Sequence, residues 1–182
     1  MKINGINRKT ALEFLGVKGD VPDDITALIE KYEPLLLEKI TPRYVYIVKK
    51  REQISALLKG EDIKEHLKNC DNIILLAATA GLACDELIRY TETHDMAGAV
   101  VLDALASAAI EQICDRAEYE IKRKYGEITT RFSPGYGDFP LDVQKNLLAV
   151  LEAKKTIGLY SIESDMLLPR KSVTAVIGIL GG

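Results

Sequence analysis

Apolar and polar positions along the chain predict a series of short strands separated by helices. The segments Arg43–Lys50 and Asn72–Thr79 are rich in β-branched, aromatic and aliphatic residues, as expected of a half-buried strand and a buried strand. Near the C-terminus, Ile157–Ile162 and Ser172–Leu180 have the same character and are separated by Pro169. We therefore expect strands at these four positions.

Helical patterns account for most of the remaining chain. From Asp95 to about Lys124 there is no proline and the sequence is rich in alanine, which predicts one long central helix. A further helix should follow Pro22, with Asp23 as its cap, and Pro34 should kink or split it, so that the pattern fits two helical pieces as well as one. Shorter helices are expected at Arg8–Leu15, Glu61–Asn69, Leu82–Tyr90 and Leu141–Leu151.

These elements indicate an α+β fold with a mostly antiparallel, twisted sheet, flanking helices and one long central helix. The sequence contains neither a linker-like segment nor an internal repeat. A length of 182 residues is ample for one hydrophobic core. We therefore expect residues 1–182 to form a single domain.

Composition narrows the classes of function. Apolar residues make up 47% and charged residues 28%, as in ordinary globular proteins. A formal net charge of −3 gives no general attraction to nucleic acid or anionic membranes, so we expect neither as a partner. The N-terminus has no apolar stretch of the signal-peptide type, and three cysteines without a Cys-x-x-Cys spacing indicate reduced thiols. A cytoplasmic protein is expected.

The segment Arg131–Gly137, Arg-Phe-Ser-Pro-Gly-Tyr-Gly, combines several residue types that bind ligands. Arginine grips a carboxylate with two parallel hydrogen bonds, glycine lets the backbone approach a ligand, and tyrosine offers a flat face and a hydroxyl. The segment lies between Ile128–Arg131, which we expect to be β-like, and the helix at Leu141–Leu151. From the residues alone, an ordinary Pro-Gly turn with a solvated arginine is the favoured interpretation.

Common catalytic and nucleotide-binding patterns are absent from the sequence. It contains no His-Glu-x-x-His, no nucleophile elbow, no Gly-x-x-x-x-Gly-Lys-Ser/Thr loop and no Gly-x-Gly-x-x-Gly fingerprint. Neither of the two histidines has the surroundings of a metal ligand. We expect no catalytic acid, base or nucleophile and no protein-bound metal.

The Arg131–Gly137 segment resembles the Arg-x-x-x-Gly-Tyr motif of the S-adenosylmethionine-binding activation domain of cobalamin-dependent methionine synthase. Ser161–Ser164 is similar to that family's Leu-Thr-Glu-Ser signature, and Pro169 with Ser172–Thr174 continues its Pro-x-x-Ser-Val-Ser pattern. Asp103–Glu111 resembles its alanine-rich central helix. On this resemblance the chain is a short, stand-alone member, with an N-terminal part at 1–94 and a ligand-binding part at 95–182.

The resemblance assigns roles to individual residues. It implies that Arg131 binds the methionyl carboxylate of S-adenosylmethionine. The backbone from Ser133 to Gly135 would meet the amino-acid or adenosine portion, and Tyr136 would line the same pocket. Glu163 and Ser164 are secondary candidates, for which the anchoring of a turn by side-chain to backbone hydrogen bonds is an equally good interpretation.

The chain also departs from the family's pattern. Members fused to methionine synthase have a ligand-contacting glutamate on the central helix where this chain has Ser107. Glu111 lies one turn later on the same helix face and could replace it, although a pairing with a nearby cation is equally consistent. Those members also have an aromatic pair after the Ser-Val-Ser segment, where this chain has Val176 and Ile177.

The function that the resemblance implies is the reductive methylation, and thus the reactivation, of cobalamin. The cobalamin would be carried by a separate methyltransferase subunit, of methionine synthase in methionine biosynthesis or of a related corrinoid system. Flavodoxin or another reductant would supply the electron. The alternative, motivated by Ser107 and Ile177, is a docking partner of a corrinoid protein that no longer uses S-adenosylmethionine.

Overall fold

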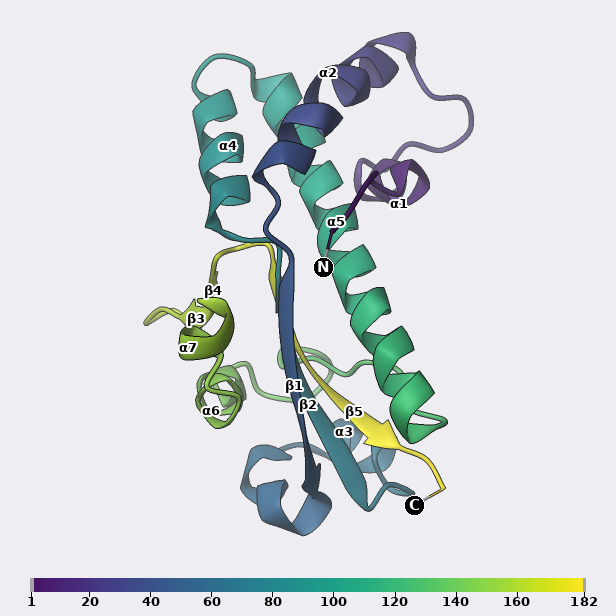
Figure 1. Cartoon of the computed structure of the whole chain (residues 1–182), viewed down its shortest axis with the longest axis vertical. Coiled ribbons are helices and arrows are strands. Elements are labelled where there is room, and N and C mark those ends of the chain that lie inside the picture. The colour runs from purple at the N-terminus through teal and green to yellow at the C-terminus, as the bar shows by residue number, and fades with distance from the viewer. Residues whose placement is uncertain (1, 182) are drawn as a thin grey trace.

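The computed structural model describes residues 2–181 and shows helices packed around an antiparallel sheet (Figure 1). This arrangement confirms the predicted α+β fold with one long central helix. The helices are α1 (Arg8–Phe14), α2 (Asp23–Lys39), the 3-10 helix η1 (Arg51–Leu57), α3 (Glu61–His66), α4 (Leu82–Glu92), α5 (Met96–Tyr125), α6 (Val143–Val150) and α7 (Ala153–Ile157). The strands are β1 (Arg43–Lys50), β2 (Asn72–Thr79), β3 (Tyr160–Ser161), β4 (Leu167–Leu168) and β5 (Ser172–Ile179).

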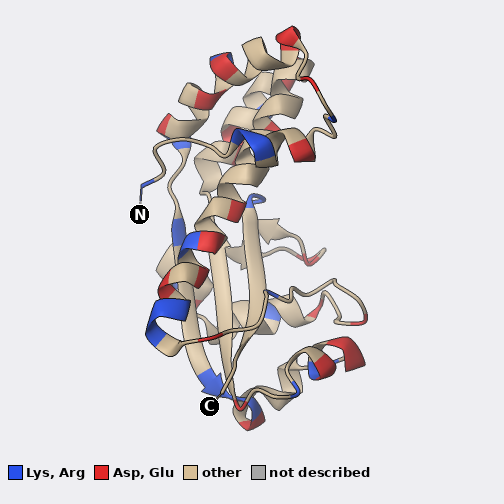
Figure 2. Cartoon of the chain, turned by 90° about the vertical axis from the view of Figure 1, so that its right-hand side faces the viewer, with Lys and Arg blue, Asp and Glu red and all other residues tan. Residues whose placement is uncertain are grey.

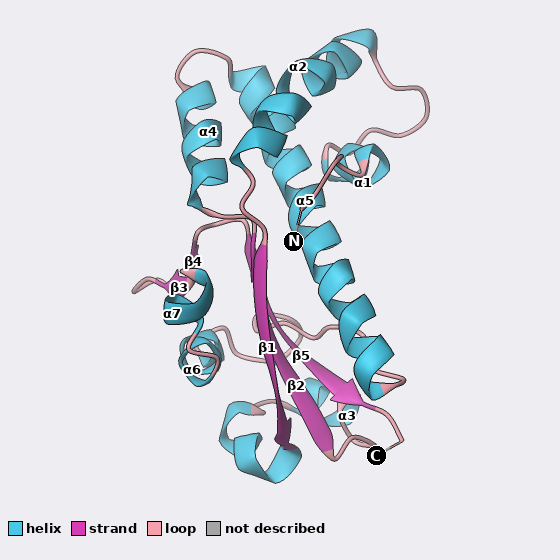
Figure 3. Cartoon of the chain, in the orientation of Figure 1, coloured by secondary structure: helices cyan, strands magenta, loops and turns pink. Residues whose placement is uncertain are grey.

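The main sheet has the strand order β1-β2-β5, and both pairings are antiparallel (Figure 3). Thr79 at the end of β2 lies opposite Arg43 of β1 and Ser172 of β5. The central strand β2 is buried along almost its whole length, which explains why its sequence is continuously apolar rather than alternating. The lengths of β1 and β2 match the sequence prediction residue for residue.

Helices cover both faces of this sheet. Ile73, Leu75 and Ala77 of β2 point into a core formed with η1, α3, α6 and α7. Ile74 and Leu76 point to the opposite face, where they pack against the C-terminal half of α5. The N-terminal half of α5 extends beyond the sheet and packs with α1, α2 and α4 (Figure 1).

Helix α5 is the central support of the fold because it contacts both the helical layer and the sheet. It starts where predicted, since the side chain of Asp95 accepts a hydrogen bond of 2.8 Å from the backbone of Gly98. Its last turn contains Lys122, Arg123 and Lys124, which suit the negative end of the helix dipole (Figure 2). By length and composition α5 is able to span a membrane, but 67% of its most apolar stretch is buried, as in the core helix of a globular protein.

In the N-terminal half, one prediction was left open and another needs correction. Of the one or two helical pieces that the sequence allowed around Pro34, the structure has one, because α2 runs without a break from Asp23 to Lys39. Pro22 occupies the cap position, and Asp23 is the first helical residue, where its negative charge suits the helix N-terminus. The 3-10 helix η1 was not expected; its buried Ile54 and Leu57 are three residues apart, the spacing of a 3-10 turn.

The strand predictions around the candidate loop were also partly wrong. Most of Ile157–Ile162 is not β structure, since α7 ends at Ile157 and only Tyr160 and Ser161 pair, forming a short hairpin with β4. Buried Ala153 and Ile157 are four residues apart, a helical spacing that the β-rich composition concealed. Ile128–Arg131 is not a strand either; isolated bridges join Ile128 to Ile179 and Phe132 to Val176.

Candidate functional site

The loop that follows α5 is held against the edge of β5, and this places Arg131 beside the long helix. Phe132 and Val176 exchange backbone hydrogen bonds of 2.9 and 2.8 Å, and Thr129 donates one of 2.9 Å to Gly178. The loop thus crosses from α5 to β5 just before the glycine-rich segment. Arg131 is fixed between these contacts, and its side chain is only 20% exposed.

The glycine-rich segment itself forms a compact turn. Gly135 donates a backbone hydrogen bond of 2.8 Å to Phe139, and Tyr136 donates one of 3.1 Å to Ser133. Gly135 has a φ of 94°, a conformation that L side chains rarely adopt. Phe139 is fully buried in the core beneath the sheet and anchors the end of the turn.

Helix α3 braces the same turn from outside. The carboxylate of Asp138 accepts hydrogen bonds from the backbone of Glu61 (2.6 Å) and Asp62 (3.0 Å), and these bonds lower the pKa of Asp138. The side chain of Asp62 accepts a hydrogen bond of 3.1 Å from the backbone of Asp138 in return. At Gly137, where φ is 54°, a Cβ would collide with the Asp62 carboxylate. This reciprocal bonding requires glycine at position 137.

Arg131 lies against three carboxylates of α5, and we call these four residues the Arg131 cluster. Its Nη2 is 2.8 Å from Glu111 Oε2 and 3.4 Å from Asp115 Oδ1. Its Nε is 2.7 Å from Glu118 Oε1, an ion pair in which the carboxylate oxygen lies off the N–H direction and accepts no hydrogen bond. The third guanidinium nitrogen, Nη1, is buried and has no acceptor among residues 2–181.

The carboxylates of the Arg131 cluster influence one another's ionisation. Burial raises the pKa of Glu118 to about 7, and the charges of Asp115 and Glu111 add to this shift. Burial and Glu111 also raise the pKa of Asp115. The guanidinium of Arg131, 2.7 Å from Glu118, acts in the opposite direction. The cluster therefore holds more negative charge than its single arginine neutralises.

A second cation, which the sequence gave no reason to select, lies further along the same face of α5. Lys171 Nζ is 2.8 Å from Asp103 Oδ1 and donates a hydrogen bond of 2.9 Å to Ser107 Oγ. Its side chain is largely buried although it precedes strand β5 directly. Lys171 thereby engages Ser107, the position at which fused members of the resembled family have a glutamate. In the sequence, the only indication of a special role for Lys171 was its position just before an apolar strand.

The structure brings some of the predicted site residues together. Arg131 and Glu111 are in direct contact, so of the two interpretations of Glu111 that the sequence left open, the structure shows the pairing with a nearby cation. Ser133 and Gly135 follow in the turn, with Gly135 exposed and Ser133 half-buried. Tyr136 is 63% exposed and packs edge-on against Phe132, at 6.5 Å between ring centroids. Arg131 and Glu111 thus meet on the α5 side of the loop, whereas Tyr136 packs on Phe132, which belongs to the core on the other face of the sheet.

Glu163 and Ser164 lie away from Arg131 and the glycine-rich turn. They are exposed residues between β3 and β4, and Figure 1 shows this hairpin on the side of the sheet away from α5. Gln144 of α6 holds the hairpin through a hydrogen bond of 2.5 Å to the backbone oxygen of Asp165, and its side chain also accepts one of 3.0 Å from Thr174. The structure therefore does not bring these two residues to Arg131.

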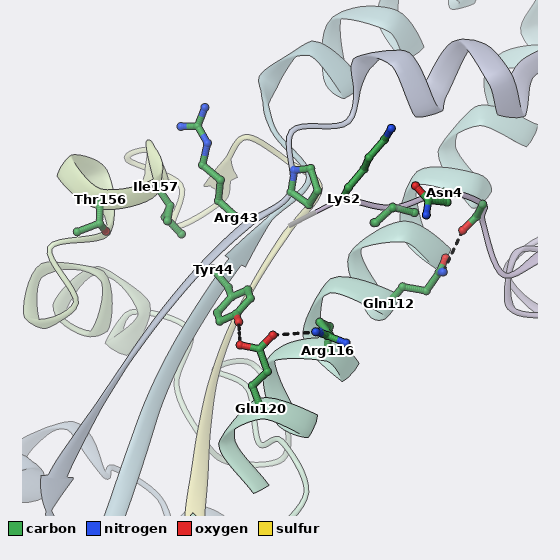
Figure 4. A pocket seen from close by; sticks show the side chains of 12 residues that line it. Lys2, Asn4, Arg43, Tyr44, Gln112, Arg116, Glu120, Thr156 and Ile157 are labelled. Carbon is green, nitrogen blue, oxygen red and sulfur yellow. Dashed lines mark hydrogen bonds and ion pairs between the residues drawn. The ribbon is translucent and has the colours of Figure 1, made fainter. Parts of the chain in front are cut away.

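A separate cavity of about 810 Å³ opens between β1 and α5 (Figure 4). Tyr44 and Arg116 both donate hydrogen bonds to Glu120 at its floor, the latter at 2.9 Å. Burial and the Glu120 charge raise the pKa of Tyr44 to about 12, while the hydrogen bonds from Tyr44 and Arg116 lower the pKa of Glu120. No residue of the Arg131–Gly137 segment lines this cavity.

Metal-binding geometry is not found among residues 2–181. No group of three or more His, Cys, Asp or Glu side chains there could hold an ion. The three cysteines are buried and unpaired, and burial raises the pKa of Cys84 to about 12, so that its thiol stays protonated. His66 contacts the backbone oxygen of Thr130 at 2.9 Å and packs against Phe132, a supporting position behind the loop.

Comparison with solved structures places this architecture among known folds. The chain is similar to a protein described as the MetH reactivation domain bound to AdoHcy, seen in a crystal structure, with a TM-score of 0.68 and 16% sequence identity. The similarity covers 96% of this chain and 74% of that one. Neither a protein-family model nor a curated protein sequence matches the chain. At this identity the likeness establishes a shared fold.

Proposed function

We propose that this protein binds S-adenosylmethionine at the Arg131–Gly137 loop and supports the reductive methylation of cobalamin carried by a separate protein. The observation that carries the proposal is that Nη1 of Arg131, the first residue of the glycine-rich segment, is buried and has no acceptor among residues 2–181. A buried donor without a partner is unfavourable, and a ligand carboxylate would satisfy it. The shared fold with a domain bound to AdoHcy adds support.

Each residue of the site has a role in this proposal. Arg131 binds the methionyl carboxylate through Nη1, and the exposed backbone near Gly135 meets the ligand closely. Tyr136 offers an exposed ring for contact with the adenosine portion. Glu111 already pairs with Arg131, so its first task is to orient the guanidinium rather than to bind ribose.

The protein's contribution to the reaction is positional. S-adenosylmethionine, when bound, supplies the methyl group, and the partner's cobalamin receives it together with an electron from flavodoxin or another reductant. The residues of this chain bind and orient the methyl donor, which is consistent with the lack of a catalytic acid, base or nucleophile in the sequence. In this proposal the chain is a cytoplasmic component of a methionine synthase or related corrinoid methyltransferase system.

A second candidate function is that of a docking partner that no longer uses S-adenosylmethionine. It is motivated by Ser107, which is bonded to Lys171 where fused members of the resembled family have a ligand-contacting glutamate. It is also motivated by Ile177, which is fully buried beneath α5 and therefore offers no ligand contact. Both functions predict binding to a corrinoid protein, but only the first requires the methyl donor.

Calorimetric titration with S-adenosylmethionine tests the proposed site. We expect Arg131→Ala to weaken binding at least about tenfold, because the ligand carboxylate loses its charge-assisted hydrogen-bond donor. Arg116→Ala is the matched control, since Arg116 also pairs with a carboxylate of α5 but lies at the separate cavity. Circular dichroism checks that both variants are folded. Unchanged affinity in a folded Arg131→Ala protein would refute the assignment.

A methylation assay separates the two candidate functions. The protein is mixed with a Co(II) corrinoid protein, a reductant and S-adenosylmethionine, and methylcobalamin is followed by its absorbance. The proposed function predicts methylcobalamin formation that depends on both the protein and the methyl donor. Complex formation with the corrinoid protein in the absence of any methylation would instead support the docking function.

A further inference from the structure

The Arg131 cluster has a surplus of negative charge that no other cation offsets. One guanidinium faces the three carboxylates of Glu111, Asp115 and Glu118, which leaves two negative charges when all are ionised. Among residues 2–181, no second lysine, arginine or histidine forms an ion pair with any of these three side chains. By contrast, Asp103 on the same helix has its own partner in Lys171. Among the acidic residues of α5 in the described chain, the surplus thus lies at these three positions, because Glu120 also has its own partner in Arg116.

The three carboxylates line one face of α5 and are graded in exposure. Positions 111, 115 and 118 are four and three residues apart, a spacing that places side chains on the same side of a helix. Glu118 is 27% exposed and lies deepest, whereas Asp115 is 70% exposed. A cationic group can therefore approach the cluster from the Asp115 side without displacing Arg131.

The methylated and demethylated forms of the expected ligand differ in charge at one atom. S-adenosylmethionine has a carboxylate, an ammonium group and a sulfonium group, which together give a net charge of +1. S-adenosylhomocysteine has a thioether in place of the sulfonium and is neutral overall. Apart from the methyl group, the two are otherwise identical. A site with surplus negative charge distinguishes them by electrostatic attraction.

We propose that the carboxylates of the Arg131 cluster make this site selective for the sulfonium form of the ligand over the thioether form. The inference rests on the proposed function, because it assigns specificity to the same loop and helix. Arg131 holds the carboxylate common to both forms, and Asp115 and Glu118 respond to the charge that only one form has. Burial raises the pKa of Glu118, and the charges of Asp115 and Glu111 add to this shift, as expected where carboxylates crowd together. Loss of the methyl group then weakens retention of the ligand.

Three ligands test this selectivity by calorimetric titration near neutral pH. They are S-adenosylmethionine, S-adenosylhomocysteine and sinefungin, in which a carbon bearing a protonated amine replaces the sulfonium centre. We expect the sulfonium form to bind about tenfold or more tightly than the thioether form. Sinefungin should resemble the sulfonium form, because it restores the positive charge without the methyl-donating sulfur.

Isosteric variants assign the selectivity to residues. In Glu118→Gln and Asp115→Asn the affinity ratio of the two forms should fall severalfold, and in the double variant it should approach one. Glu127→Gln is the control, because Glu127 is exposed and pairs with Lys122 outside the cluster. Its ratio should equal that of the wild type. Equal loss of affinity for both forms in the double variant would indicate a purely structural role and overturn the assignment.

The wild-type protein provides a test that needs no variant. Raising the salt concentration from about 0.05 M to about 0.5 M should reduce the affinity ratio, because screening weakens attraction between partly exposed charges. Equal affinity for both forms at low salt would overturn the selectivity while leaving the proposed function intact. Failure of all three ligands to bind would instead refute the proposed function.

Discussion

Two arginines pair with carboxylates of α5, and their surroundings differ in charge balance. Arg116 and the hydroxyl of Tyr44 together satisfy the single carboxylate of Glu120 at the cavity in Figure 4. Arg131 faces three carboxylates, and one of its own nitrogens is buried without an acceptor among residues 2–181. The first group is electrostatically complete, whereas the second lacks both a cation and an acceptor.

The difference separates an ion pair that is complete without a ligand from one that, in the proposed function, a ligand completes. Exposed and balanced pairs such as Arg116 with Glu120 contribute little to stability and need no ligand. A largely buried arginine among several acids is costly unless another group completes it. In the proposed function, a zwitterionic ligand with extra positive charge would supply both of the groups that the Arg131 cluster lacks.

The largest effect on stability should come from replacing Arg131, and the same replacement of Arg116 provides the comparison. Arg131→Met should lower the free energy of unfolding by about 2 kcal/mol, because it leaves Glu118 partly buried beside two other carboxylates without a cation. Arg116→Met should leave stability unchanged within error, since its pair is exposed to water. Urea denaturation of both variants near neutral pH measures the contrast. Equal losses would show that the two sites are not different.

The pH dependence of stability should reveal the raised pKa of Glu118 in the folded state. Its pKa is raised in the folded state to about 7 from an ordinary value of 4.5, so the folded protein binds its proton more tightly than the unfolded chain. Protonated Glu118 therefore stabilises the folded state, and this contribution is fully present below pH 4.5 and is lost as the pH rises to about 7. We expect the loss to be only about 1 kcal/mol, because Arg131 opposes the shift. Glu118→Gln should flatten this part of the pH profile. A profile identical to that of the wild type would contradict the shift.

The smallest effect should follow from Tyr44→Phe. The substitution removes one hydrogen bond to Glu120 but leaves Arg116 in place, so we expect at most a slight decrease in the midpoint of thermal unfolding. Binding of S-adenosylmethionine should be unchanged, because Tyr44 lies at the separate cavity. A loss of binding as large as that of Arg131→Ala would place the ligand at this cavity instead.

Local chemistry made much of the fold predictable from the sequence. The β-branched and aromatic residues of Arg43–Lys50 predicted β1 to the residue, and the alanine-rich, proline-free stretch from Asp95 to about Lys124 predicted α5 to within a residue. The short helices η1 and α7 were missed because, in so few residues, apolar spacing does not separate a helix from a strand. The order of the strands in the sheet depends on pairing between residues that are far apart in the sequence, and a local pattern cannot predict such pairing.

The candidate site was only partly predictable for the same reason. The glycines and Arg131 of the loop stand out within one short segment, whereas Asp115 and Glu118 look like the solvated face of any helix. They become part of the site because the bridge from Phe132 to Val176 carries Arg131 back to α5, many residues along the chain. Lys171 was hidden in the same way, since its partners lie on α5 far earlier in the sequence.

The bracing of the loop by α3 has a consequence for the entropy of association. Because Asp138 and Asp62 bond to each other's backbone, the turn is ordered before any ligand arrives. Binding to an ordered loop loses little conformational freedom, so more of the interaction energy remains as affinity. The segment Arg131–Gly137 is therefore not an independent unit of seven residues, because without α3 it would lose the hydrogen bonds that order it.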